Sequence, residues 1–249
     1  MGMSDSIVII PTYNEKENIE AIIKAVFALP HAFDILIIDD NSPDKTGEIV
    51  KDLQKLFPEK LYLIEREGKQ GLGTAYIAGF KWALQRSYQY IFEMDADFSH
   101  NPADLPRLHE ACTSQGADVA VGSRYYSGVN VVNWPMGRVL MSYFASKYVQ
   151  FITCMKIQDT TAGFVCYRRE VLETIDLDNI RFKGYAFQVE MKYTAYCLKF
   201  KIKEVSIIFV NRIYGESKMN SSIFREGVFG VVALRIRKML GRIKAKKQQ

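Results

Sequence analysis

Two acidic side chains separated by one small residue offer the clearest chemistry in the sequence. Asp95 and Asp97 follow the apolar run of residues 88–94, so the pair stands where a buried strand would leave the core. Two carboxylates this close repel each other, and each costs free energy to desolvate unless a positive group offsets it. A bound cation, a shared proton or exposure to water would each relieve that conflict. Carboxylate oxygens suit Mg²⁺ or Mn²⁺, whose coordination is usually completed by water and substrate phosphates. We therefore predict a divalent-metal site that holds a diphosphate.

The elements that must position this pair follow from alternating apolar and polar stretches. Five apolar runs predict buried strands, which begin at Ser6, Asp34, Lys60, Tyr88 and Ala117. Helices are expected between them: after Asn14 as N-cap, from Pro43 with Ser42 as N-cap, over residues 71–87, and from Pro102. Strands that alternate with helices indicate an α/β fold with a mostly parallel sheet and helices on both faces.

Polar residues gather after four of these strands, in the segments PTYNE, DDNSPD, DADFSH and GSRY. Open α/β sheets bind ligands beyond the carboxyl ends of their strands, so these segments are predicted to line one crevice. There Asp40 is placed to accept hydrogen bonds from a nucleobase or a ribose. Gly71 and Gly73 do not have the spacing of a dinucleotide-binding loop, and the sequence contains no Walker-type phosphate loop.

Five ordered motifs carry a resemblance to a known family: IIPTYNEKENI, IDDNSPDKT, MDADFSHNP, GSRY and RIYGESKM. Over about residues 5–220 the chain resembles the polyprenyl-phosphate (dolichol-phosphate) mannosyltransferases, which belong to the inverting glycosyltransferases of family 2. The resemblance implies a GT-A fold, which is Rossmann-like. It also implies transfer of a sugar, usually mannose from GDP-mannose, to the phosphate of a polyprenol or dolichol carrier.

For the donor, the resemblance implies a nucleotide pocket lined by Pro11, Tyr13, Glu15, Ile38 and Asp40. Asp95 and Ala96 would contact the ribose or the base, and Asp97 would bind Mg²⁺ or Mn²⁺. Members of the family often supply a glutamine as a further metal ligand two residues later. Here that position is Ser99, so its hydroxyl or a water would complete the coordination.

For the acceptor, the resemblance implies that Arg124, Arg138 and Ser142 meet the lipid phosphate. Arg212 and Lys218 would close over the donor diphosphate. Arginine presents a planar fork of donors that suits phosphate, and lysine presents a mobile point charge.

The phosphate acceptor decides what catalysis requires. A phosphate oxygen is already anionic at pH 7, so no general base is predicted. Catalysis would rest on positioning and on stabilisation of the leaving diphosphate through Asp97 and its metal, with Arg124, Arg212 and Lys218. Glu190, in the region where relatives with hydroxyl acceptors carry a base, would either hold sugar hydroxyls or lie on a polar helix face. His100 is expected to orient the acidic loop.

Charge patterning suggests a membrane surface. The net charge is +5, and its excess gathers in residues 235–247, which contain Lys and Arg but no acid. We therefore expect a catalytic domain over residues 1–220 and a basic amphipathic helix over 221–249 that lies on anionic lipid. Residues 139–155 are expected to form a second surface-lying helix, since they are too polar to span a bilayer. The protein would then be peripheral at the cytoplasmic face of a membrane, and without a recognition motif no nucleic-acid partner is predicted.

Other functions remain open at this level. The donor could be a UDP-sugar, such as UDP-glucose, or the acceptor a saccharide hydroxyl. A non-catalytic subunit that binds a nucleotide sugar would have the same residues. A phosphatase is disfavoured, since its D-x-D pair would follow the first strand and this one follows the fourth.

Overall fold

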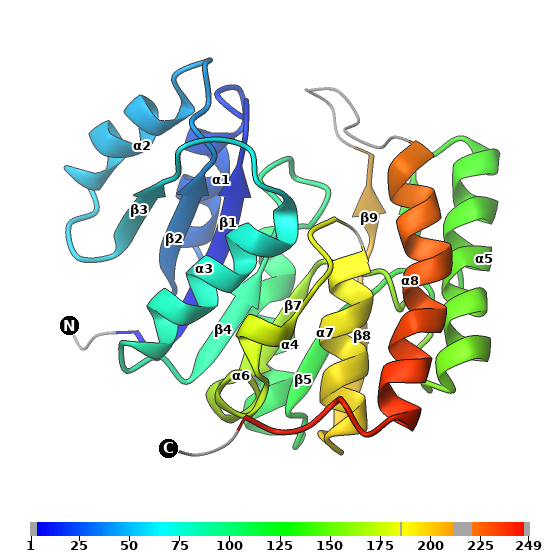
Figure 1. Ribbon diagram of the computed structural model, residues 1–249. Coiled ribbons are helices and arrows are strands. Elements are labelled where there is room, and N and C mark those ends of the chain that lie inside the picture. The colour runs from blue at the N-terminus through cyan, green and yellow to red at the C-terminus, as the bar shows by residue number, and fades with distance from the viewer. Residues whose placement is uncertain (1–3, 185, 212–220, 247–249) are drawn as a thin grey trace.

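The sheet at the centre of the protein has seven strands in the order β3-β2-β1-β4-β7-β5-β8 (Figure 1). The structure is a computed structural model that describes residues 4–184, 186–211 and 221–246. The strands of this sheet are β1 (Ser6–Thr12), β2 (Asp34–Asp39), β3 (Leu61–Glu65), β4 (Tyr90–Glu93), β5 (Val119–Ser123), β7 (Val165–Arg168) and β8 (Ile202–Ser206). All pairs are parallel except those of β7, which runs antiparallel to both of its neighbours. The predicted α/β fold is confirmed.

Helices cover both faces of the sheet. They are α1 (Ile19–Phe27), α2 (Thr46–Gln54), α3 (Leu72–Leu84), α4 (Leu105–Thr113), α5 (Met136–Thr153), α6 (Arg169–Thr174), α7 (Ala186–Cys197) and α8 (Ser221–Met239). Alternate β1 residues explain the two layers: Val8 and Ile10 pack with α1 and α4, whereas Ile7 and Ile9 pack with α3 and α7. Because both faces are covered, β2 is buried along its whole length.

A smaller layer lies outside the sheet. Helix α8 packs on α7 and α5, and Val231 and Leu234 are its buried contacts (Figure 1). The short strands β6 (Val131–Val132) and β9 (Phe209–Val210) pair beside this layer. The helix expected over 139–155 is α5, and α8 covers most of the predicted C-terminal helix. The division of the chain at residues 220 and 221 stays a prediction.

Two predicted helix starts are wrong. Helix α1 begins at Ile19, because Asn14 is left-handed with φ 57° and donates its N–H to the Ser42 hydroxyl. Helix α2 begins at Thr46, because Ser42 turns back and bonds Asp39 with its N–H and its hydroxyl. The Ser42 hydroxyl, which was taken for a helix cap, instead joins the two strand-end loops, since it accepts the Asn14 N–H and donates to Asp39.

Candidate active site

The acidic loop follows β4 at the carboxyl edge of the sheet. Asp95 is partly exposed, with 39% of its side chain accessible, whereas Asp97 is only 7% exposed. The Ser99 N–H donates to Asp97 Oδ1 over 3.0 Å, and Phe98 between them takes a left-handed φ of 58°. Ala96 is buried under the loop. The turn therefore fixes the Asp97 carboxylate, and it brings Ser99, which is itself buried, next to it.

His100 supports this loop from within. It is 3% exposed, and its ring stacks on Phe164 with a centroid separation of 4.9 Å. Its Nδ1 accepts the Asp95 N–H over 3.3 Å. Burial lowers the pKa of His100 to about 4, against the opposing charge of Asp97, so the ring is neutral at neutral pH. The contacts agree with the predicted role of orienting the loop.

Arg124 follows β5 and is held by a carboxylate that sequence reasoning missed. Its Nε and Nη2 each donate to Asp159 over 2.6 Å, its N–H donates to the same carboxylate, and Nη2 also reaches the Thr161 hydroxyl. Asp159 is fully buried and Arg124 is 8% exposed. Burial would raise the pKa of Asp159, but the charge and hydrogen bonds of Arg124 outweigh it and keep that pKa below its ordinary value.

Arg138 and Ser142, predicted to meet the same phosphate, lie on the first turns of α5. The Arg138 guanidinium lies 4.1 Å from the centroid of the Trp134 ring, and Arg124 lies 5.6 Å from that same ring. Arg138 also donates to Asn211 Oδ1 over 2.9 Å. Ser142, one turn later on the same face, lies by the Tyr125 phenol. Trp134 thus brings the two guanidinium groups together, and the three predicted acceptor residues share one region.

The predicted nucleotide edge follows β1 and β2. Asp40 is paired with Arg66, whose Nε donates to Oδ1 over 2.5 Å, and Arg66 also bonds the Thr74 hydroxyl over 2.8 Å. Lys69 lies 5.1 Å from the Tyr13 ring, so the loop between β3 and α3 faces the loop after β1. Arg66 and Lys69 were missed, since nothing in their local sequence marks them as part of a site.

The other three residues that were predicted to line the nucleotide pocket are Pro11, Glu15 and Ile38, and they differ in exposure. Pro11 and Glu15 are partly exposed at the end of β1 and in the loop that follows it, and the Glu15 carboxylate accepts from the Asn18 amide over 3.0 Å. Ile38 is fully buried among the core residues that face α3. Any contact of Ile38 with a nucleotide would therefore come from its main chain.

An acidic and a basic side chain are buried together beneath the acidic loop. Glu93, the last residue of β4, is fully buried, and so is Lys192 of α7, which donates to the Ala162 carbonyl over 2.6 Å. Burial raises the pKa of Glu93 and lowers the pKa of Lys192, because each charge is remote from water. Lys192 also lies within electrostatic reach of Asp159. The floor of the site therefore holds three buried ionisable groups, Glu93, Lys192 and Asp159, which sequence reasoning did not find.

Glu190 lies on the same helix but is engaged elsewhere. Its carboxylate accepts the N–H groups of Arg181 and Phe182 over 2.8 and 2.9 Å and pairs with Arg237 of α8 over 2.6 Å. It is 1% exposed, so it lies on a buried face of α7 rather than in solvent. These three contacts make Glu190 a junction between α7, α8 and the segment that precedes α7.

Two predicted residues, Arg212 and Lys218, lie outside the described part of the chain. The remaining predicted residues do gather at one edge of the sheet. The acidic loop and Arg124 are neighbours, because the charges of Asp97 and Arg124 both act on His100 and that of Asp95 acts on Arg124. Their arrangement offers carboxylates for a cation on one side and guanidinium groups for an anion on the other.

Comparison with known proteins agrees with this arrangement. Residues 7–176 match Glycosyl transferase family 2. The chain is 45% identical over 237 residues to polyprenol monophosphomannose synthase of Mycolicibacterium smegmatis, covering 95% of this chain and 89% of the relative. It is 44% identical over 223 residues to undecaprenyl-phosphate mannosyltransferase of Micrococcus luteus, covering 90% of each chain.

A solved structure shares the fold. Glucosyl-3-phosphoglycerate synthase from Mycobacterium tuberculosis, in complex with Mn²⁺, UDP and glucosyl-3-phosphoglycerate, superimposes with a TM-score of 0.66 at 16% identity. The match covers 96% of this chain and 80% of that one, and at this identity it shows the GT-A-like fold alone. The family match and the two relatives show that the chain is a glycosyltransferase and belongs to glycosyltransferase family 2.

Proposed function

We propose that this enzyme transfers mannose from GDP-mannose to the phosphate of a polyprenol carrier, with Mg²⁺ or Mn²⁺ as cofactor. The names of the two relatives support the sugar and the acceptor class. The observation that carries the proposal is that the acidic loop lies beside the cluster of Arg124, Trp134 and Arg138, since the charges of Asp97 and Arg124 both act on His100. One half suits a metal-bound diphosphate and the other suits a phosphate monoester.

The donor half fits a hard divalent cation. Asp97 presents carboxylate oxygen from a buried, hydrogen-bonded turn, and the partly exposed Asp95 lies two residues before it. Such a cation would neutralise charge on the departing nucleoside diphosphate. Asp97 would hold it together with Ser99 or water. Asp95 and Ala96 would contact the ribose or base, beside Tyr13 and the Asp40–Arg66 pair.

The acceptor half binds and orients the nucleophile. Asp159 takes the Nε and Nη2 edge of Arg124, so the Nη1 side of that guanidinium would face the lipid phosphate. Arg138 and Ser142 would contact it from α5. These groups hold one phosphate oxygen in line with the bond to be broken. That positioning lowers the entropic part of the activation barrier, because the two reactants are already oriented.

The reaction is a single displacement. An acceptor phosphate oxygen forms a bond to the anomeric carbon while the bond from that carbon to the GDP oxygen breaks. The electron pair leaves with GDP, and the configuration inverts. A phosphate needs no base, and Glu190 is already bonded to Arg181, Phe182 and Arg237. Arg212 and Lys218 would stabilise the leaving diphosphate.

We propose a peripheral location at the cytoplasmic face of a membrane, with helices α5 and α8 lying on the lipid. Within the described residues no helix is long and apolar enough to cross a membrane. Both helices instead expose large apolar side chains, such as Phe144, Phe151 and Phe229. A helix of that kind binds at the boundary between headgroups and acyl chains, where a lipid-linked phosphate also lies.

The test is transfer of labelled sugar to a short polyprenyl phosphate. GDP-mannose and UDP-glucose are supplied in parallel, each with Mg²⁺ and with EDTA. We expect product from GDP-mannose only, and only with the metal. Asp97→Asn should abolish it, whereas Asp52→Asn on the exposed face of α2 should not. If product formed from UDP-glucose alone, the donor would be UDP-glucose and the proposed GDP-mannose donor would be wrong. Binding of nucleotide sugar without any product would contradict transfer to this acceptor.

A further inference from the structure

Three side chains that could bind a metal gather at the opposite edge of the sheet from the acidic loop. Asp5 immediately precedes β1, His31 lies in the turn between α1 and β2, and His109 lies on α4. Since β1 and β4 run parallel, the amino end of β1 and the acidic loop after β4 are at opposite edges. None of the three residues takes part in the transfer mechanism described above.

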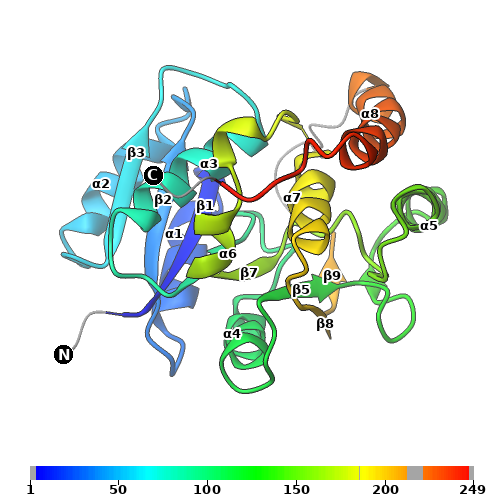
Figure 2. The same ribbon diagram turned by 60° about the horizontal axis from the view of Figure 1, so that its bottom comes forward.

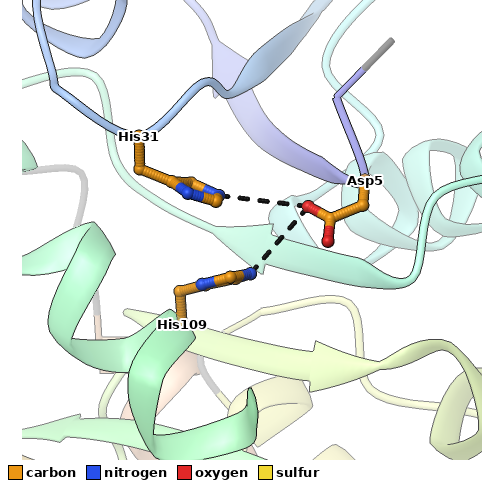
Figure 3. A group of neighbouring side chains, drawn as sticks. All are labelled: Asp5, His31 and His109. Carbon is orange, nitrogen blue, oxygen red and sulfur yellow. Dashed lines mark ion pairs between the residues drawn. The ribbon is translucent and has the colours of Figure 1, made fainter. Parts of the chain in front are cut away.

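The geometry of this cluster converges on one point (Figure 3). The Nε2 atoms of His31 and His109 each lie 3.9 Å from Asp5 Oδ1, and the three ligand atoms all lie within 4.8 Å of one another. A separation of 3.9 Å is too long for a hydrogen bond. Both Nε2 atoms are buried, and neither has a hydrogen-bond partner among the described residues. Two imidazole nitrogens therefore point at one carboxylate oxygen with space between them.

Aromatic neighbours hold both imidazole rings in place. The two rings lie against each other with centroids 4.2 Å apart. His31 also packs edge-on against Phe33 at 4.7 Å, and His109 packs edge-on against Tyr90 at 4.6 Å. The cluster is thus restrained before any ligand arrives.

We propose that Asp5, His31 and His109 form a second cation site, specific for a borderline transition metal such as Zn²⁺. Two imidazole nitrogens and one carboxylate are a common zinc donor set, whereas Mg²⁺ prefers oxygen ligands alone. Tetrahedral ligands at about 2.0–2.1 Å from zinc lie about 3.3 Å apart, so each His–Asp separation of 3.9 Å has to shorten by about 0.6 Å. The separation of the two imidazole nitrogens, which is at most 4.8 Å, has to shorten by up to about 1.5 Å. A water would take the fourth position on the partly exposed side of Asp5.

A metal at this place ties three parts of the fold together. Asp5 also accepts the N–H groups of Gln89 and Tyr90 through its carbonyl, so its backbone already joins β1 to β4. Zinc would add the α1–β2 turn and α4 to that junction. We expect the metal to affect stability, because a ligand that binds only the folded state raises the free energy of unfolding. The sugar transfer supported by Mg²⁺ should not depend on it.

The site is tested by zinc titration of the full chain, freed of any polyhistidine tag and held in excess Mg²⁺ to occupy the acidic loop. We expect one Zn²⁺ per chain and a higher melting temperature with zinc than without it. His31→Asn and Asp5→Asn should each weaken zinc binding by at least about tenfold and remove the thermal shift. Co²⁺ should give the visible absorption of a tetrahedral complex in the wild type only.

Two control variants locate the metal. Asp97→Asn and Cys154→Ser alter the acidic loop and an exposed thiol, and both should keep the zinc stoichiometry of the wild type. Sugar transfer by His31→Asn in Mg²⁺ should also equal that of the wild type, which shows that the variant is folded. Zinc bound equally well by His31→Asn and the wild type would overturn the proposal, and so would a wild type that binds no zinc.

Discussion

At the scale of single residues, the Arg124 side chain depends on a carboxylate remote in sequence. Asp159 is fully buried and is bonded by Arg124 through Nε, Nη2 and the main-chain N–H. Its own N–H donates to Glu204 over 2.9 Å, which anchors the loop that carries it. Two buried charges are costly unless each is satisfied by the other, so the pair fixes one orientation of the guanidinium beside Trp134.

Asp159→Asn should lower both stability and transfer. The amide keeps the size but removes the charge, and it leaves the Arg124 cation buried without its counter-ion. Breaking such a pair costs about 3–5 kcal/mol of unfolding free energy, which urea denaturation would measure. Asp52→Asn, on an exposed surface pair, should cost less than about 1 kcal/mol. Equal stability of the two variants would show that the buried pair contributes nothing.

The same pair predicts a difference in acid sensitivity. Because the pKa of Asp159 is lowered in the folded protein, its stabilisation is complete above its ordinary value of 3.8 and is lost as the pH falls below that value. Asp159→Asn has no such group to protonate. Between about pH 4 and pH 3 its unfolding free energy should therefore fall less steeply than that of the wild type, by up to about 1.4 kcal/mol per pH unit.

Short motifs predicted residues that the structure brings to one edge of the sheet, but not the partners that hold those residues in place. Asp97 and Arg124 stand in short local patterns next to predicted strand ends. Asp159 is 35 residues from Arg124, and Arg66 is 26 residues from Asp40. A contact over such a distance leaves no periodic or compositional signal in one sequence. The motifs could be predicted, whereas their partners required the fold.

At the scale of elements, alternation predicted strands β1 to β5 and missed β8 and the antiparallel β7. This strand is short, and it inserts between β4 and β5 in the opposite direction, which a strand–helix alternation does not indicate. Helix α7 also escaped prediction. It is buried on all sides, and its polar residues Gln188 and Lys192 lie in the interior, so it has no apolar stripe.

A variant of Glu190, at the junction of α7 and α8, tests whether this residue has a structural or a catalytic role. Glu190→Gln should keep the maximal transfer rate within about threefold, since its carboxylate is bonded within the protein and a phosphate nucleophile needs no base. Loss of a general base would instead lower the rate about 10²–10⁴-fold. Steady-state rates at saturating GDP-mannose distinguish the two outcomes.

Arg237→Met tests the same junction from the other side. Among the described residues it leaves the buried Glu190 charge with the N–H groups of Arg181 and Phe182 as donors, so the melting temperature should fall clearly below that of the wild type. Arg242→Met, which alters an exposed arginine just beyond the helix, is the matched control and should leave the melting temperature unchanged. If the melting temperature fell equally in both variants, the effect would come from the loss of one positive charge and not from the Arg237–Glu190 contact.

At the scale of the whole molecule, α5 and α8 form an outer layer at one edge, beyond α7 (Figure 2). Both helices expose large apolar side chains: Met136, Leu140, Met141, Phe144 and Phe151 on α5, and Phe229, Val232, Ile236 and Met239 on α8. Such residues recur at helical spacing, so each helix presents a stripe. Exposed apolar stripes of this kind on a protein surface mark an interaction site, and basic residues close to the stripe on α8 favour anionic lipid.

Removing α8 would be a poor test of lipid binding, because Val231 and Leu234 belong to a buried cluster with α5 and α7. The combined substitution Phe144→Ser, Phe151→Ser and Phe229→Ser changes exposed side chains and spares that cluster. It should abolish flotation with vesicles that contain anionic lipid. The affinity for free GDP-mannose should stay within about twofold, since the proposed donor site lies in the strand-end loops.

Leu56→Ser is the control for that experiment, since Leu56 is 66% exposed and lies just after α2, at the opposite side of the sheet. It should float as the wild type does. Transfer to long-chain polyprenyl phosphate in vesicles should fall in the triple variant, but transfer to a short soluble acceptor should not. If both acceptors lose activity together, the three phenylalanines act on the fold or the active site. If neither does and flotation persists, the lipid contact lies on another face.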